Sequence, residues 1–208
     1  MIGIIGGTFD PIHFGHLRPA LEIAEQLELD EVRFIPSATP PHRWQPDASA
    51  EDRLEMVKLA IQDTPIFKMD DREYQRDGAS YTVDTLKSIR NEVGNQTAIC
   101  MIIGLDAFQS FTQWRDWQGI LDRCHLVVSS RPGYKATEID ESLAKRVVEN
   151  AQALRQKTAG GVFFAEVTQL DISATFIRKE LSNGRSSRYL TTNAVNKYIA
   201  RNKLYEIK

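Results

Sequence analysis

Residues 2–16 read IGIIGGTFDPIHFGH, an apolar run followed by a glycine-rich turn and two histidines. The isoleucines within residues 2–5 suit a buried strand, and Gly6 and Gly7 let the backbone approach a ligand with no side chain in between. From Gly15 onward the apolar residues recur with helical spacing, at Leu17, Ala20, Leu21, Ala24 and Leu27. The stretch therefore predicts a strand, a tight turn and a helix, which is the opening unit of an α/β fold.

His13 and His16 lie in the turn and at the first residues of this predicted helix. Free backbone N–H groups and the positive end of the helix dipole favour an anion there, so the two imidazoles point to a phosphate site. The glycine spacing matches neither G-x-G-x-x-G nor G-x-x-x-x-G-K-[ST], which argues against a dinucleotide turn or a P-loop. Two alternatives stay open, namely a metal site, which needs two or three further ligands, and histidines that only cap and pack.

Strand and helix signals alternate along the rest of the chain, which is typical of a parallel sheet with crossover helices. Strands are predicted at residues 32–36, 66–69, 98–103, 126–128 and 162–167. Helices are predicted after Ser49, at residues 82–92 and 143–154, after Ser173, and at residues 191–201. The continuous apolar character of residues 99–103 and 126–128 predicts strands in the middle of the sheet. We therefore expect an α/β fold, a Rossmann-like parallel sheet with helices on both faces and a small C-terminal helical extension.

Composition restricts the class of protein. The chain has 208 residues, two cysteines and a formal net charge of −2, and its isoelectric point is about 6.1. Two cysteines make no disulfide framework, and no basic stripe suggests a nucleic acid or a membrane surface as partner. Since there is no basic and apolar leader and no apolar span of about 18 residues, we expect a cytoplasmic protein with a single domain over residues 1–208.

Two segments carry a family resemblance. Residues 6–16 resemble the G-x-F-D-P-x-H-x-G-H signature of the nucleotidyltransferase superfamily, which includes cytidylyltransferases and adenylyltransferases. Residues 172–178, ISATFIR, resemble its second motif, I-S-S-T-x-I-R, and depart from it at Ala174. Ser173 is in any case a good helix N-cap, and the alternative is an ordinary capped helix. The resemblance makes residues 172–208 a helical part of the domain that carries the second phosphate-binding motif.

The superfamily resemblance implies roles for particular residues. It implies that ATP is bound by Gly6, Gly7, Thr8, Phe9, His16, Ser173, Thr175 and Arg178. A narrower resemblance, to the I-G-x-D segment of the nicotinate-mononucleotide adenylyltransferases, adds Gly104 and Asp106 on the adenosine side. It also implies that the catalytic residues are His13, His16 and Arg178. The first motif alone identifies the superfamily and not the substrate.

Further segments resemble the nicotinate-mononucleotide adenylyltransferases. They are Pro40-Pro41-His42-Arg43 (P-P-H-K in that family), Ser80-Tyr81-Thr82 (S-Y-T), Ile103-Gly104-Leu105-Asp106 followed by Trp114 (I-G-x-D…W), and residues 129–133. The resemblance implies that nicotinate mononucleotide is bound by His42, Arg43, Tyr81, Thr82, Trp114 and Arg131. The alternatives are a solvated loop at residues 37–44, an ordinary surface position for Arg131, and core positions for Phe108, Phe111 and Trp117.

The implied activity joins ATP and nicotinate mononucleotide to give nicotinic acid adenine dinucleotide and pyrophosphate, a step of NAD synthesis. We expect Mg²⁺ to arrive on the ATP phosphates, without dedicated protein ligands, because the sequence offers no carboxylate cluster for it. Alternatives are a nicotinamide-mononucleotide or other small-molecule adenylyltransferase of the superfamily, and a non-catalytic nucleotide-binding sensor. The partners expected are the two small-molecule substrates, in a monomer or small homo-oligomer.

Overall fold

Six strands form a sheet with the order β3-β2-β1-β4-β5-β6. The structure is a computed structural model that describes residues 1–40, 45–133 and 139–206. The strands are β1 (Ile2–Gly7), β2 (Glu31–Pro36), β3 (Phe67–Met69), β4 (Ile99–Gly104), β5 (His125–Ser130) and β6 (Val162–Glu166). β4 pairs in parallel with β1 and with β5, and β5 pairs in parallel with β6. The predicted parallel sheet is confirmed, and β4 and β5 are interior strands as their apolar sequences indicated.

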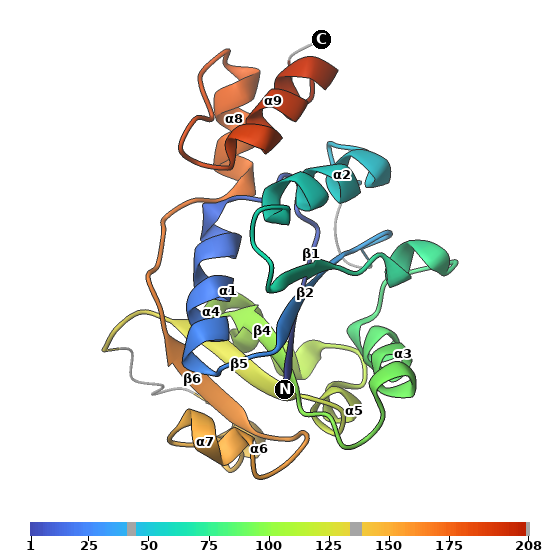
Figure 1. Ribbon diagram of the computed structural model, residues 1–208, viewed down its shortest axis with the longest axis vertical. Coiled ribbons are helices and arrows are strands. Elements are labelled where there is room, and N and C mark those ends of the chain that lie inside the picture. The colour runs from blue at the N-terminus through green and yellow to red at the C-terminus, as the bar shows by residue number, and fades with distance from the viewer. Residues whose placement is uncertain (41–44, 134–138, 207–208) are drawn as a thin grey trace. The chain divides into compact units, whose positions relative to one another are not determined.

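Helices connect the strands, and Figure 1 shows α1 and α3 on opposite sides of β1. The helices are α1 (Phe14–Gln26), α2 (Ala50–Ile61), α3 (Thr82–Val93), α4 (Leu105–Gln109), α5 (Trp117–Leu121), α6 (Glu141–Ala144), α7 (Ala151–Leu154), α8 (Ala174–Ser182) and α9 (Asn193–Asn202), with short 3₁₀ helices η1 (Arg72–Gln75) and η2 (Phe111–Gln113). Ser49 caps α2 as predicted, since its hydroxyl accepts from the Asp52 N–H at 3.0 Å. None of the helices among the described residues is long and apolar enough to cross a membrane.

The chain forms two compact units. Unit 1 comprises Met1–Gly6, Pro19–Arg33 and Tyr81–Gln169, and unit 2 comprises Gly7–Arg18, Phe34–Ser80 and Leu170–Lys208. Unit 1 contains β4, β5 and β6, and the side chains of Leu126, Val127 and Val128 in β5 are fully buried. A strand buried in this way has covered faces, which is what a sheet between helical layers requires.

One predicted helix of unit 1 is wrong. Residues 143–154 form two separate short helices, α6 and α7, and Asp140 and Asn150 each cap one of them with a side-chain oxygen. Between these helices the backbone turns to β6, because the Val148 N–H donates to the Val162 carbonyl at 2.9 Å and the Val162 N–H donates to the Arg146 carbonyl at 2.8 Å. Pairing with a strand took precedence over the helical spacing of the apolar residues.

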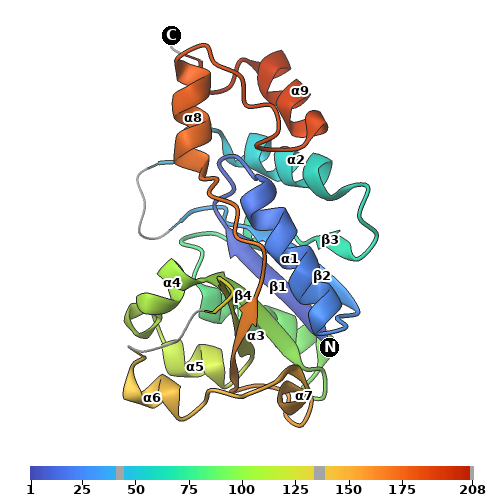
Figure 2. The ribbon, with the colours of Figure 1, turned by 90° about the vertical axis from the view of Figure 1, so that its left-hand side faces the viewer.

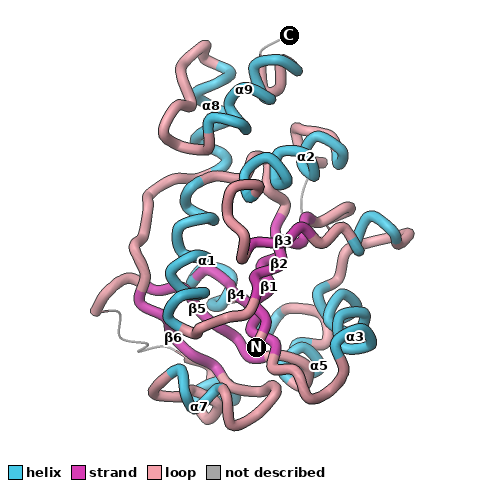
Figure 3. The backbone as a smooth tube through the Cα atoms, viewed as in Figure 1, coloured by secondary structure: helices cyan, strands magenta, loops and turns pink. Residues whose placement is uncertain are grey.

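Three helices characterise unit 2. Figure 2 shows α8 and α9 near α2, and Figure 3 shows that a loop joins α8 to α9. The Tyr198 hydroxyl of α9 donates to the Asp52 carboxylate of α2 at 2.8 Å, and Val195 and Ile199 of α9 are buried. The predicted C-terminal helical extension is therefore present, and its last helix is joined to α2, some 140 residues earlier in the chain.

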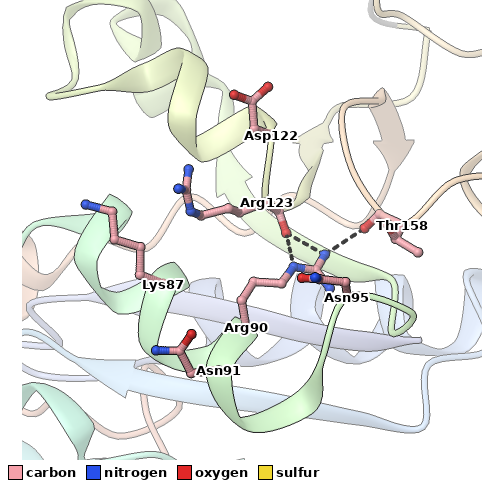
Figure 4. Close-up of a pocket in the computed structure, with 7 residues that line it drawn as sticks. All are labelled: Lys87, Arg90, Asn91, Asn95, Asp122, Arg123 and Thr158. Atoms are coloured by element: carbon pink, nitrogen blue, oxygen red, sulfur yellow. Dashed lines mark hydrogen bonds between the residues drawn. The ribbon is translucent and has the colours of Figure 1, made fainter.

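A polar pocket lies in unit 1 at the edge where β5 begins. Its volume is about 460 Å³, and it is lined by Lys87, Arg90, Asn91, Asn95, Asp122, Arg123 and Thr158 (Figure 4). In open α/β sheets ligands bind outside the carboxyl ends of the strands, and this pocket lies at the amino ends. All five N–H groups of the Arg90 guanidinium donate to backbone carbonyls, namely those of Gly94, Thr97, Arg123 and Thr158. Arg90 therefore joins the end of α3 to the segments that lead into β4, β5 and β6.

We expect replacement of Arg90 by methionine to lower the free energy of unfolding by about 2 to 4 kcal/mol, because four carbonyls lose a charged donor. Lys87→Met is the matched control. Lys87 lines the same pocket, but it makes an exposed ion pair with Asp84 at 3.0 Å, so the change should stay within about 0.5 kcal/mol. Urea unfolding measures both variants. Equal small effects would show that Arg90 does not hold these segments together.

Candidate active site

The turn after β1 belongs to unit 2 and is organised around a buried carboxylate. Asp10 is 5 % exposed. Its carboxylate accepts from the backbone N–H groups of Asp47 at 2.8 Å and Ala48 at 3.2 Å, and from the Tyr205 hydroxyl at 2.7 Å. Burial, and the proximity of Asp10, raise the pKa of Tyr205 far above its usual value, so this hydroxyl stays protonated. The turn is thus fixed from two directions, by the residues before α2 and by the C-terminal segment.

The two predicted phosphate motifs meet within unit 2. The Arg178 guanidinium of α8 donates from Nη1 to the carbonyl of Asp10 at 2.7 Å. A Cβ atom on Gly15 would lie 2.9 Å from Nδ1 of His13 and 3.1 Å from the carbonyl oxygen of Ile172, the residue before Ser173. Only glycine fits such a close approach without displacing backbone. The two segments therefore lie in contact, although 168 positions separate Asp10 from Arg178.

His13 and His16 stack on each other. Their ring centroids are 3.8 Å apart with 30° between the ring planes, and the edge of the Phe9 ring packs against His16 with centroids 5.2 Å apart. Nδ1 of His16 accepts from the backbone N–H of His13 at 3.3 Å. A neutral imidazole that accepts at Nδ1 carries its proton on Nε2. His16 therefore offers an Nε2–H donor.

Both imidazoles are held in the neutral form. Burial lowers the pKa of His13 from 6.5 to about 4. Burial, and then the charge of His13, lower the pKa of His16 well below 6.5. At neutral pH these histidines act as neutral hydrogen-bonding groups, so any fixed positive charge here must come from other residues.

The start of α8 has the geometry of an anion site. Ser173 is the N-cap as predicted, and its hydroxyl accepts from the Phe176 N–H at 3.1 Å. The hydroxyl proton of Ser173 is then free to donate, and Thr175 beside it is exposed. Nε of Arg178 pairs with the Asp47 carboxylate at 2.5 Å, so part of this guanidinium is already engaged. Phe176, the third residue of α8, is 46 % exposed.

Unit 1 holds the residues that were assigned to the adenosine side. Gly104 ends β4 and Asp106 follows in α4. A Cβ atom on Gly104 would lie 2.6 Å from Oδ1 of Asp106. The missing side chain of Gly104 thus makes room for the Asp106 carboxylate, which folds back over the end of the strand. Gly6, the last residue of unit 1 before the turn, is exposed.

Unit 1 also holds most of the residues that were assigned to the mononucleotide. Thr82 is the first residue of α3, directly after Tyr81, and the Arg115 guanidinium lies 4.3 Å from the centre of the Tyr81 ring. Trp114 is half-buried, and its ring contacts that of Phe111 with centroids 5.5 Å apart. Arg131 follows β5 and is exposed.

The alternatives for the aromatic residues have separate outcomes. Phe108 and Phe111 are buried core residues, as their spacing predicted. Trp117 is half-buried and its ring contacts Phe111.

His42 and Arg43, predicted to bind the mononucleotide, lie outside the described residues. No group of three or more His, Cys, Asp or Glu side chains in the described part of the chain is placed to hold a metal ion.

Comparison with known proteins assigns the family. The model of the cytidylyltransferase-like family matches residues 4–180. A probable nicotinate-nucleotide adenylyltransferase of Halorhodospira halophila is 46 % identical over 93 % of this chain and 90 % of its own length. One from Methylococcus capsulatus is also 46 % identical, over 99 % of both chains. The chain belongs to the nicotinate-nucleotide adenylyltransferases of the cytidylyltransferase-like family.

Solved structures of this family agree in fold. The nicotinic acid mononucleotide adenylyltransferase of Plasmodium falciparum, in a structure complexed with NaAD, superposes with a TM-score of 0.75 at 19 % identity over 98 % of this chain and 96 % of its own. A putative nicotinate-nucleotide adenylyltransferase from Vibrio parahaemolyticus superposes with a TM-score of 0.65 at 20 % identity. At such identities the likeness is one of fold, and the predicted α/β fold and family resemblance are both confirmed.

Sequence reasoning missed several residues that contact the turn after β1. Asp10 belongs to the first motif, yet its buried carboxylate was not assigned a role. Arg53 was missed although it precedes the buried residues Met56 and Val57 of α2 by three and four positions, so a charge on the inward helix face was a visible signal. Tyr205 gave no such signal, because only the folded C-terminal segment brings it to Asp10.

Acid should destabilise the protein through His13. Its pKa is about 4 in the folded protein, against 6.5 for the ordinary side chain, so the unfolded chain binds more protons between these values. The stabilisation from a neutral His13 is complete above pH 6.5 and is lost as the pH falls towards 4. Between pH 7 and pH 5 the free energy of unfolding should fall by roughly 2 kcal/mol more in the wild type than in His13→Gln. Urea unfolding at both pH values measures the difference, and parallel behaviour of the two proteins would contradict a neutral buried His13.

Proposed function

We propose that this chain transfers the adenylyl group of ATP to nicotinate mononucleotide, with the two converging motifs of unit 2 as the triphosphate site. The observation that carries the proposal is the contact of Arg178 with the Asp10 carbonyl, which joins the two segments of sequence that resemble phosphate-binding motifs. The 43 to 46 % identity to probable nicotinate-nucleotide adenylyltransferases supports the choice of substrates.

The reaction needs placement and charge stabilisation more than proton transfer. A phosphate oxygen of the mononucleotide, already anionic, attacks the α-phosphorus of ATP. The bond from that phosphorus to the oxygen bridging to the β-phosphate breaks, and pyrophosphate leaves with the electron pair. Because the nucleophile carries no proton that must be removed, the neutral state of His13 and His16 suits the chemistry. Catalysis then rests on donors that are fixed before the substrate arrives.

We assign those donors to unit 2. Nε2–H of His16 and the Ser173 hydroxyl are donors whose orientation is fixed by the hydrogen bonds they accept. The backbone N–H groups at the start of α8 add the positive end of a helix dipole, and Arg178 adds a full charge. Gly7 and Thr8 contribute backbone at and after the end of β1, as does Gly6, the last residue of unit 1, and Thr175 contributes a second hydroxyl. In this proposal negative charge that moves to the departing pyrophosphate is met by groups that need no rearrangement.

Of the described residues, those that we assign to the mononucleotide side lie in unit 1. Trp114 and Tyr81 present aromatic surface for a pyridine ring, and the first N–H groups of α3, beginning at Thr82, are donors for its carboxylate. Arg131, with His42 and Arg43, is assigned to the phosphate of the mononucleotide. Gly104 and Asp106 are assigned to the adenosine, where the carboxylate accepts from ribose hydroxyls.

The proposal includes the setting of the reaction. Mg²⁺ enters with ATP as part of the substrate, because this ion keeps several waters and binds readily to phosphates. We propose a cytoplasmic enzyme that acts as a monomer or small homo-oligomer, with small molecules as its only substrates.

Removal of the His16 donor should impair turnover more than binding. We expect His16→Ala to lower kcat about a hundredfold or more, because loss of one preorganised donor typically costs roughly 3 to 4 kcal/mol of transition-state stabilisation. His16→Gln is the matched variant and should retain part of the activity, since its amide can donate near the position of Nε2. Steady-state release of pyrophosphate measures both. A variant that changes only the KM for ATP would refute the catalytic assignment.

The acid should be preferred over the amide. A carboxylate accepts hydrogen bonds at both oxygens, whereas a carboxamide sets its NH₂ group against backbone donors, a mismatch of about 1 to 3 kcal/mol. We therefore expect kcat/KM to be about tenfold to a hundredfold higher with nicotinate mononucleotide than with nicotinamide mononucleotide. Pyrophosphate release from ATP with each compound tests this directly. Equal rates would indicate an adenylyltransferase that does not distinguish the two mononucleotides. Pyrophosphate release with neither compound would indicate a nucleotide-binding sensor.

A further inference from the structure

Arg53 is the largest fully buried side chain of the described residues, and it lies in unit 2. It occupies the inward face of α2 together with Met56, Val57 and Ile61, and only 1 % of its surface is exposed. A charged side chain at such a position is uncommon, because taking a guanidinium out of water is costly unless other groups compensate it.

The compensation comes from backbone carbonyls of two turns. Nη1 of Arg53 donates to the carbonyl of Thr8 at 2.9 Å and to that of Ser37 at 2.7 Å, and Nη2 donates to the carbonyl of Ala38 at 3.2 Å. No carboxylate among the described residues lies within ion-pair distance of this guanidinium. Among the described residues the guanidinium therefore has carbonyl partners and no ion-pair partner.

The two turns follow neighbouring strands. Thr8 comes directly after β1 and Ser37 directly after β2, and the Ser37 N–H donates to the Gly7 carbonyl at 2.9 Å. Residues after the carboxyl ends of parallel strands form the ligand-binding edge of an open α/β sheet. From the inward face of α2, Arg53 thus joins two turns of that edge. One of them is the turn of the first phosphate motif.

The hydrogen bonds of Arg53 are not those expected of a side chain that only fills space in the core. Its Nε is buried and has no hydrogen-bond partner among the described residues, so the side chain leaves one donor unsatisfied while both terminal nitrogens reach the turns. A core position alone would be better filled by an apolar side chain of similar volume. What the guanidinium adds is a fixed geometry for three carbonyls and a permanent charge beneath the turn.

We propose that Arg53 is a positioning residue for adenylyl transfer, which holds the turn of residues 7–10 in the geometry that receives the triphosphate. The inference rests on the proposed function of that turn. Arg53 touches no substrate in this scheme. It acts through the Thr8 carbonyl, which orients the following peptide groups, and through a positive charge that no carboxylate pairs, which favours the anionic substrate at short range.

The test compares Arg53→Met with Arg53→Lys at a temperature where circular dichroism shows each variant folded. Methionine is close in volume and removes both donors and charge. Lysine keeps the charge but has one nitrogen in place of the two that reach the carbonyls of both turns. Misplacement of a catalytic turn by about 1 Å costs on the order of a hundredfold in rate. We expect kcat for Arg53→Met to fall about 10- to 100-fold, with a smaller fall for Arg53→Lys and a rise in the KM for ATP that is smaller than the fall in kcat.

Arg90→Met is the matched control, because Arg90 also joins backbone carbonyls but does so at the amino ends of the strands. It should lower the unfolding temperature and leave kcat per folded molecule within about twofold of the wild type. If Arg53→Met and Arg90→Met both lose stability and neither loses kcat, Arg53 is only a structural residue and the proposal is wrong. If Arg53→Met does not fold, Arg53→Lys decides, and a folded lysine variant with wild-type kcat overturns the proposal.

Hydrogen exchange separates this inference from the proposed function. Peptides that cover residues 7–10 and 36–39 should exchange faster in Arg53→Lys than in the wild type, and equally in Arg90→Met and the wild type. A wild type that releases no pyrophosphate with nicotinate mononucleotide and ATP refutes the proposed function alone. In that case unchanged exchange of both peptides in Arg53→Lys overturns the role of Arg53, and faster exchange supports its hold on the turn.

Discussion

The hydrogen bond from Arg178 to the Asp10 carbonyl fixes the most demanding feature of this structure, the approach of two turns that lie at opposite ends of the sequence. Closing so long a loop is entropically unfavourable, so the contact depends on other links between the same segments. Thr191 donates to the carbonyl of Ile12 at 2.8 Å, and the Phe14 N–H donates to the carbonyl of Leu190 at 3.0 Å. The residues after α8 therefore hold the first motif in place as much as α8 itself does. Tyr205 adds another such link, because its hydroxyl donates to the buried Asp10 carboxylate although it lies beyond residues 4–180, which the family model matches.

The electrostatics of unit 2 follow from burial. Two imidazolium rings 3.8 Å apart would repel each other, and their burial already favours the neutral forms. The histidines are therefore oriented hydrogen-bonding groups, and Arg53 and Arg178 each bring a positive charge to the turn. Arginine stays protonated at any physiological pH. The phosphate site proposed here, built on arginines, a helix N-terminus and neutral imidazoles, would keep its charge across the range in which histidine normally titrates.

Local features of this fold were predictable and tertiary ones were not. The strand, turn and helix of residues 2–26, the interior strands β4 and β5, and the caps at Ser49 and Ser173 follow from periodicity and capping, which depend on near neighbours in sequence. The helix predicted at residues 143–154 was wrong because Val147 forms a parallel bridge with Val162 of β6, a contact that no local pattern contains. The motif residues were identified by resemblance, and their roles stay proposals. Asp10, Arg53 and Tyr205 act through partners far along the chain, so their contacts had to come from the structure.

Two arginines, Arg53 and Arg90, each bond several backbone carbonyls, but their environments differ. Arg90 satisfies all five of its N–H groups and retains contact with solvent, which is the arrangement expected when the purpose is to join segments. Arg53 is almost completely buried, leaves Nε unpaired and faces no carboxylate, which is a poorer solution for stability alone. Features that oppose stability tend to persist where function requires them. A guanidinium without an ion-pair partner, bonded to the turn proposed to receive a triphosphate, is such a feature, because in that proposal the substrate brings negative charge to the turn. The cost of burying Arg53 would then be offset when ATP binds, and the free protein would hold the turn ready for it.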